Sequence, residues 1–144
     1  MFLGSGDCTL TNLMVRGTTK GACALLPSTD AGYCLKSGET AASRGIALLG
    51  PSKVTLQSFD LVNNGTMGAQ LLLGTGQDGT AFGTTGTLTL TDGTVTSQDV
   101  GVNLQDVTGY DESSLQNNVS YAGATTPIAH DTKTSPQYIV TPTK

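Results

Sequence analysis

Residues 45–74 read GIALLGPSKVTLQSFDLVNNGTMGAQLLLG, and this stretch decides the fold of the chain. Apolar residues alternate with other residues in two short segments, at Ile46 and Leu48 and again at Val54 and Leu56. A period of two is typical of half-buried β-strands. The turn formers Gly-Pro-Ser and Asn-Asn-Gly separate the segments. The stretch therefore predicts short strands joined by tight turns.

Two motifs in this stretch recur along the chain. The first begins with Gly and stands at 21–26, 45–50, 68–73 and 101–106, with a degenerate copy that begins with Pro at 127–130. The second stands 13 or 14 residues before a copy of the first, at 8–11, 54–57, 88–91 and 113–116. A sandwich of antiparallel hairpins also has short alternating strands, but it gives no reason for this constant phase. Repetition in phase predicts a solenoid whose successive coils stack at about 4.8 Å.

Stacking of the coils predicts two inward columns of side chains. One column is Ala22, Ile46, Ala69, Val102 and Ile128, and its neighbour is Ala24, Leu48, Leu71, Leu104 and His130. No stretch of 12 or more residues combines helical periodicity with good helix formers, so the chain is expected to be all-β. One repeat of 33 residues is longer than the others, and a Gly- and Thr-rich loop inserted at 74–86 accounts for it.

The stretch 45–74 resembles a coil of the right-handed parallel β-helix of the pectin-lyase-like superfamily, with its recurring pattern of GI-L, VTL, N-G and G. The similarity is clear over residues 45–107 and fainter over 8–44 and 108–130. It implies parallel strands on three faces and right-handed winding. The expected fold is thus an all-β, right-handed parallel β-helix of about five coils over residues 1–130, with the tail 131–144 over the last rung. These motifs define a scaffold and are not specific to one activity.

Composition excludes several classes of function. The 144-residue chain carries 7 Lys and Arg against 11 Asp and Glu, a net charge of −4, so a nucleic-acid groove is not expected. No apolar run reaches the roughly 20 residues of a membrane helix. Residues 1–3 do not form a signal peptide, which leaves export open, and a secreted or cell-surface location is expected. Because a solenoid end needs a cap or a partner, we expect a piece of a longer solenoid or a homo-oligomer formed through the ends.

The three cysteines allow one candidate disulfide. Cys8 and Cys34 are separated by 26 residues, about one coil, and would then lie on adjacent rungs. Cys23 is an alternative partner for either, and three unrelated thiols are the remaining interpretation. No CxxC pair and no nearby His accompany them, so neither a metal site nor a cofactor is expected.

Three residues are weak candidates for acid–base catalysis, namely Asp106, Asp111 and His130. Glycoside hydrolysis needs two such groups that converge on one bond. The resemblance implies carboxylates paired on an outward strand, or clusters of Arg and Lys, in the polysaccharide-cleaving members, and the matching motifs here carry none. The alternative is that the aspartates bond to their own backbone at turns and that His130 ends its column.

A face of hydroxyl and amide side chains is the stronger candidate site. The second motif directs these side chains outward, and we expect them to stack and to bind a ligand: Thr9, Thr11, Thr55, Gln57, Thr89 and Thr91, continued by Thr87, Ser114 and Gln116. Such an array could bind carbohydrate or order water as ice-binding solenoids do. It could equally reflect the preference of Thr for strands.

The sequence favours a non-catalytic β-solenoid segment with a structural or binding role, its partner being a polysaccharide or another protein. A fragment of a polysaccharide hydrolase or lyase is the alternative, and ice binding is the third. The sequons at Asn64 and Asn118 match the glycosylation pattern, although both asparagines also suit turns.

Overall fold

The computed structural model describes residues 2–3, 6–18, 21–22, 39–41, 44–75, 81–97, 99–131 and 140–142. The elements are β1 (Phe2–Leu3), β2 (Gly6–Thr11), β3 (Met14–Arg16), β4 (Gly21–Ala22), β5 (Glu39–Ala41), β6 (Arg44–Leu49), β7 (Ser52–Val62), β8 (Met67–Leu72), β9 (Gly74–Thr75), β10 (Ala81–Gly83), β11 (Thr87–Val95), β12 (Val100–Gln105), the 3-10 helix η1 (Glu112–Leu115), β13 (Asn117–Ser120), β14 (Thr126–Asp131) and β15 (Val140–Pro142). Strands dominate this part of the chain, which confirms the all-β prediction.

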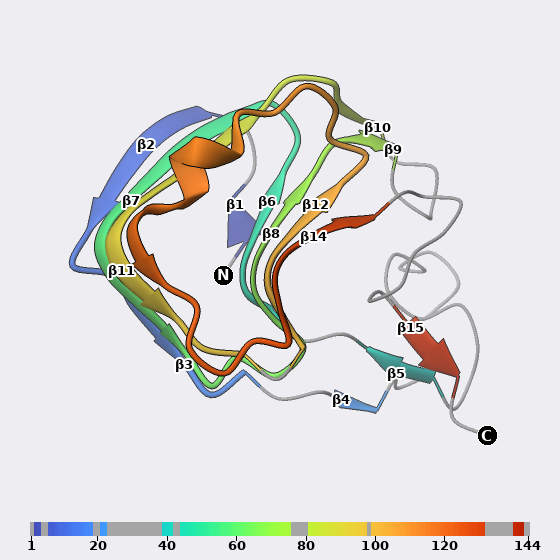
Figure 1. The fold of residues 1–144 in the computed structure, drawn as a ribbon. Helices are drawn as coiled ribbons and strands as arrows, with labels where there is room; N and C mark the ends of the chain where they lie inside the picture. Colours follow the sequence, from blue (N-terminus) through green and yellow to red (C-terminus); the bar gives the residue numbers. More distant parts are fainter. Residues whose placement is uncertain are drawn as a thin grey trace.

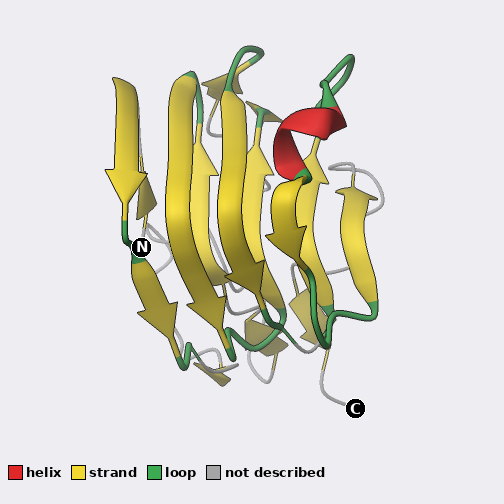
Figure 2. Ribbon diagram, turned by 60° about the vertical axis from the view of Figure 1, so that its left-hand side comes forward, coloured by secondary structure: helices red, strands yellow, loops and turns green. Residues whose placement is uncertain are grey.

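Two five-stranded sheets face each other across the core (Figure 1). Sheet A has the order β1-β6-β8-β12-β14, and sheet B has the order β13-β11-β7-β2, with β3 also beside β7. Every pair within these two sheets is parallel. The chain crosses between the sheets after each strand from β6 to β8 and from β11 to β14, and the strands of the two sheets run in opposite directions (Figure 2).

The predicted inward columns lie in sheet A. Ile46, Ala69, Val102 and Ile128 follow one another in register, and Leu48, Leu71, Leu104 and His130 form the neighbouring column. Apart from the last residue of each column, these side chains are buried. The columns are therefore confirmed from β6 to β14.

The prediction for Ala22 is wrong. Ala22 pairs with Thr40 in an antiparallel sheet of β4, β5 and β15, while Leu3 of β1 takes the place beside Leu48. A Gly-Ala pair has almost no apolar side chain with which to select the core. Ala24 lies outside the described residues.

Sheet B is built by the second motif. Val54 and Leu56 of β7 pair with Leu88 and Leu90 of β11, and all four are buried. The copy at 113–116 does not form the expected strand, because η1 covers these positions. Its backbone turns at Asp111, whose carboxylate accepts a hydrogen bond from the Ser113 N–H, and side chains of this kind favour helix starts.

Close approach of the backbone explains the Gly that begins the first motif. Gly45, Gly68 and Gly101 lie at equivalent positions of β6, β8 and β12. A Cβ at Gly68 would meet the side chain of Val95 and lie 2.9 Å from the Gly101 carbonyl oxygen. Only glycine lets the chain pass this corner at the spacing of the sheet.

Two further segments extend beyond the sheets. β9 and β10 pair antiparallel at the place of the predicted inserted loop (Figure 1). β14 continues to Asp131, and Val140–Pro142 pairs with β5, while the rest of the predicted tail lies outside the described residues. None of the helices in the described ranges is long and apolar enough to cross a membrane.

Replacement of Gly68 by Ala should destabilise the protein by about 1–3 kcal/mol, because overpacking displaces buried groups. Urea unfolding followed by circular dichroism measures the loss. Thr87→Ala, at an exposed position of β11, is the control and should change the free energy of unfolding by less than about 0.5 kcal/mol. Equal stability of the two variants would contradict the close packing at this corner.

Candidate binding surface

The six residues predicted to bind a ligand form two columns on the outer face of sheet B. Thr9, Thr55 and Thr89 stand in register in one column. Thr11, Gln57 and Thr91 form the other, and Asn117 of β13 continues it. The side chains of Thr9, Thr11 and Gln57 are exposed, and the other three are partly exposed. The chain thus presents hydroxyl and amide groups at the strand spacing of about 4.8 Å.

Two residues predicted to continue this face do not belong to it. The Ser114 hydroxyl donates to the Leu88 carbonyl oxygen at 3.2 Å and also lies 3.2 Å from the Tyr110 hydroxyl. Gln116 follows η1 instead of standing above Thr91. The reason is the replacement of a strand by η1, which moves the array by one residue to Asn117.

A column of left-handed residues directly follows the second column of the array. Asn12, Ser58, Asp92 and Asn118 have φ angles of 58°, 53°, 53° and 55°. Asn and Asp adopt this conformation more readily than most residues because their short side chains bond locally. The Asn118 amide donates to Asp92 Oδ1 at 2.7 Å, which ties two neighbouring rungs. Each strand bends at this position, and the bends align.

The aligned bends form a groove of about 800 Å³ across sheet B. It runs from the turn before β3 across β7 and β11 to β13, a path on the order of 14 Å at the usual strand spacing. Its lining residues are mostly polar and include a few apolar side chains: Asn12, Leu13, Met14, Ser58, Phe59, Asp60, Asp92, Gly93, Thr94, Gln116, Asn118, Val119 and Ser120. Among the described residues that line the groove are two carboxylates and no Lys or Arg.

The left-handed column was missed from the sequence, although a signal was present. A small polar residue follows each strand copy of the second motif, as Asn12 follows Thr11 and Asp92 follows Thr91. The three residue types differ, so the repeat was not evident as identity. Asn118 remains exposed in the groove, whereas Asn64, the other sequon asparagine, is fully buried and donates to the Val15 carbonyl oxygen at 3.0 Å.

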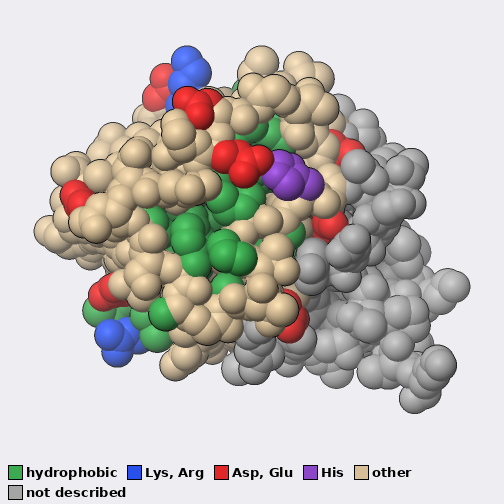
Figure 3. Space-filling view, in the orientation of Figure 1, with side chains coloured by type: hydrophobic (Ala, Val, Ile, Leu, Met, Phe, Trp, Pro, Cys, Tyr) green, Lys and Arg blue, Asp and Glu red, His purple; other side chains and the backbone are tan. Residues whose placement is uncertain are grey.

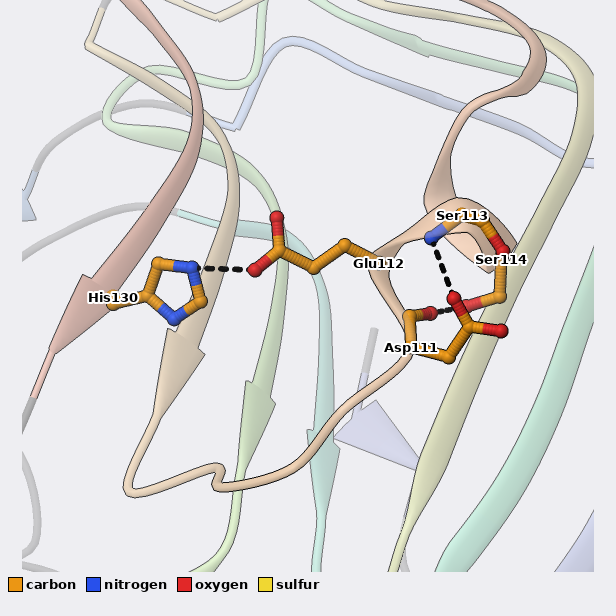
Figure 4. A network of polar contacts seen from close by, with 5 residues as sticks. All are labelled: Asp111, Glu112, Ser113, Ser114 and His130. Atoms are coloured by element: carbon orange, nitrogen blue, oxygen red, sulfur yellow. Dashed lines mark hydrogen bonds and ion pairs between the residues drawn. The ribbon is translucent and has the colours of Figure 1, made fainter.

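The candidate catalytic residues have separate structural contacts (Figure 4). His130 Nε2 lies 2.7 Å from Glu112 Oε1, so its partner is a carboxylate that the sequence did not single out. Asp111 caps η1, and hydrogen bonds from Ser113 lower its pKa. Asp106 has a left-handed φ of 53° and lies against Gly74. A lowered pKa on an exposed carboxylate is the reverse of what a general acid needs.

Tyrosine hydroxyls satisfy backbone groups near η1. The Leu88 N–H donates to the Tyr110 hydroxyl at 2.9 Å, and that hydroxyl also bonds to the Leu88 carbonyl oxygen. The Tyr121 hydroxyl donates to the Leu115 carbonyl oxygen at 2.6 Å. Burial raises the pKa of both tyrosines, so both remain protonated donors at neutral pH.

A network of hydrogen-bonded polar side chains lies on the outer face of sheet A, where it is buried. This network was not predicted from the sequence. Arg44 Nε donates to Gln70 Oε1, Gln70 Nε2 donates to Asn103 Oδ1 at 3.1 Å, and Asn103 Nδ2 donates to Asp131 Oδ2 at 3.1 Å. Gln70 and Asn103 are at most 1% exposed. A polar residue recurs between the inward apolar residues of the first motif, and this alternation was the available signal.

Cys8 is exposed and has no disulfide partner among the described residues, and Val54 lies opposite it in the neighbouring strand. Cys23 and Cys34 lie outside the described residues, so the Cys8–Cys34 disulfide stays a prediction.

No protein-family model, curated protein or solved structure matches the chain.

Removal of the Asn103 amide should lower the free energy of unfolding. Asn103→Ala takes partners from Gln70 Nε2 and Asp131 Oδ2 in a buried site, and we expect a loss of about 2–3 kcal/mol. Gln57→Ala is the matched control, since it removes an amide that is exposed on β7 and should cost less than about 0.5 kcal/mol. Thermal and urea unfolding measure both. Equal losses of stability in the two variants would show that the hydrogen bonds of Asn103 stabilise the protein no more than an exposed amide does.

Proposed function

We propose that this chain is a segment of a right-handed parallel β-helix, similar to the pectin-lyase-like superfamily, that binds polysaccharide without cleaving it. Two observations support the solenoid: the chain alternates between two parallel sheets, and equivalent residues stand in register from rung to rung. Sheet A contributes five strands, which agrees with about five coils. A polysaccharide ligand places the protein at a cell surface or in the secreted fraction.

The groove across sheet B carries the proposed binding function. Hydroxyl and amide groups stand along it at regular intervals, and an extended polymer of sugars offers hydroxyls that can donate to and accept from them. Met14, 54% exposed, and the half-buried Val119 supply apolar surface for the C–H faces of sugar rings. Because Asp60 and Asp92 line the groove, and no Lys or Arg does so in the part of the chain that the structure describes, neutral polysaccharides fit better than anionic ones.

A catalytic role is less well supported. His130 pairs with Glu112 beside η1, and Asp111 is bound to the start of that helix. Neither lines the groove. The stacked Thr residues also fit ice binding less well, since Gln57 interrupts the second column.

Loss of side-chain groups in the groove should weaken binding. The double variant Thr94→Val, Ser120→Ala removes two hydroxyls that line the groove on adjacent strands, and we expect affinity for a neutral polysaccharide to fall roughly tenfold, as for one or two hydrogen bonds. Affinity electrophoresis in gels containing xylan, mannan or soluble glucan measures retardation, with polygalacturonate as the anionic comparison. Thr108→Val, exposed and outside the groove, is the control. Unchanged retardation of the double variant, or stronger retardation by polygalacturonate, would contradict the proposal.

The same polymers test for catalysis. Incubation with the purified chain should release no reducing ends and no unsaturated products. Product formation that Asp111→Asn or Asp106→Asn abolishes would instead support the hydrolase or lyase alternative.

A further inference from the structure

The two ends of the paired sheets differ in how they protect their backbone edges. At the end formed by β13 and β14, five features oppose the addition of another strand. The helix η1 takes the place of a strand beside the first half of β11. The short strand β13 pairs only with Thr91–Thr94 of β11. Tyr110 occupies the N–H and carbonyl of Leu88 at that edge. Helices, short edge strands and occupied backbone groups are features that natural sheets use against association.

The other two features lie in β14. Pro127 is in the terminal strand of sheet A, where it has no N–H to offer to a neighbour. His130 occupies the inward column after Leu104, and its ion pair with Glu112 spans from sheet A to η1 above the apolar side chains (Figure 3). A further rung would have to bury this ion pair, which costs free energy.

None of these features is found at the opposite end in the residues the structure describes. β2 has no Pro, and no described strand pairs with its outer edge. The inward column of this edge is Cys8, Leu10, Leu13 and Val15, directly above buried residues of β7. In this column Cys8 is exposed, and Leu10, Leu13 and Val15 are only partly buried. Met14, the first residue of β3, is 54% exposed beside them. Unpaired backbone and apolar side chains are therefore available together.

We propose that a second copy of this chain docks on the β2 edge and that the assembly is a closed dimer. A twofold axis makes the two β2 strands antiparallel, so each copy offers the other the same unpaired N–H and carbonyl groups. Opposing residues of an antiparallel pair share a face, so the inward apolar columns meet and the outer Thr columns continue from one copy to the next. The protected β13–β14 end stops further growth. This inference stands independently of the proposed ligand.

Sedimentation velocity over a concentration series under reducing conditions tests the wild-type chain. We expect a reversible monomer–dimer equilibrium with no larger species. Met14→Lys and, separately, Leu10→Lys should weaken dimerisation at least tenfold, and Thr108→Lys should leave it unchanged. Met14→Lys keeps the test informative if Leu10→Lys does not fold, because Met14 is mostly exposed.

A triple variant tests whether the end formed by β13 and β14 blocks the addition of further copies. Glu112→Ala, Pro127→Val and His130→Leu together remove the ion pair and restore a backbone donor, and they should convert dimers into longer, concentration-dependent species. A wild-type chain that stays monomeric at all concentrations, or forms an open series of oligomers, overturns the proposal. So does a dimer that Met14→Lys leaves intact.

Discussion

Register between successive rungs is the constraint on which the other features depend. Each strand of sheets A and B hydrogen-bonds to a parallel strand from another part of the chain, about 4.8 Å away, so equivalent positions must tolerate one another as neighbours. Inward positions therefore repeat small and medium aliphatic side chains. Corner positions repeat glycine, because a Cβ at Gly68 would meet both Val95 and the next backbone. Register thus turns a local sequence pattern into columns that run through the molecule.

The same constraint shows which parts of the fold could be predicted from the sequence. The columns through Ile46 and Leu48 were predictable because alternation selects one face of a strand, and a one-residue slip would expose every core side chain. Ala22 was placed wrongly because Gly-Ala carries too little apolar surface to fix its neighbour. The copy at 113–116 became η1 because Asp111 and the two serines offer the backbone a cap that competes with pairing.

The candidate site was predicted in part for similar reasons. Stacked Thr and Gln side chains follow from alternation and phase, which the sequence displays directly. The groove depends on a left-handed residue after each strand segment, and Asn, Ser and Asp all fill that position, so the conformation repeats while the residue type does not. The contact between His130 and Glu112 joins segments that no motif relates. Register placed His130 at the end of its column, but only the position of η1 supplies its partner.

The two outer faces put polar residues to different uses, and the reason is charge. On sheet B the polar side chains are exposed, so each can exchange water for a ligand at little cost. On sheet A a carboxylate, Asp131, is 4% exposed and would be costly to bury without hydrogen bonds. Gln70 and Asn103 form a directed chain in which each amide accepts from the side nearer Arg44 and donates toward Asp131. Such alignment polarises the hydrogen bonds in one sense, from the guanidinium to the carboxylate. The buried charge is thereby stabilised across four strands, so the outer face of sheet A is structural, whereas the outer face of sheet B is open to solvent.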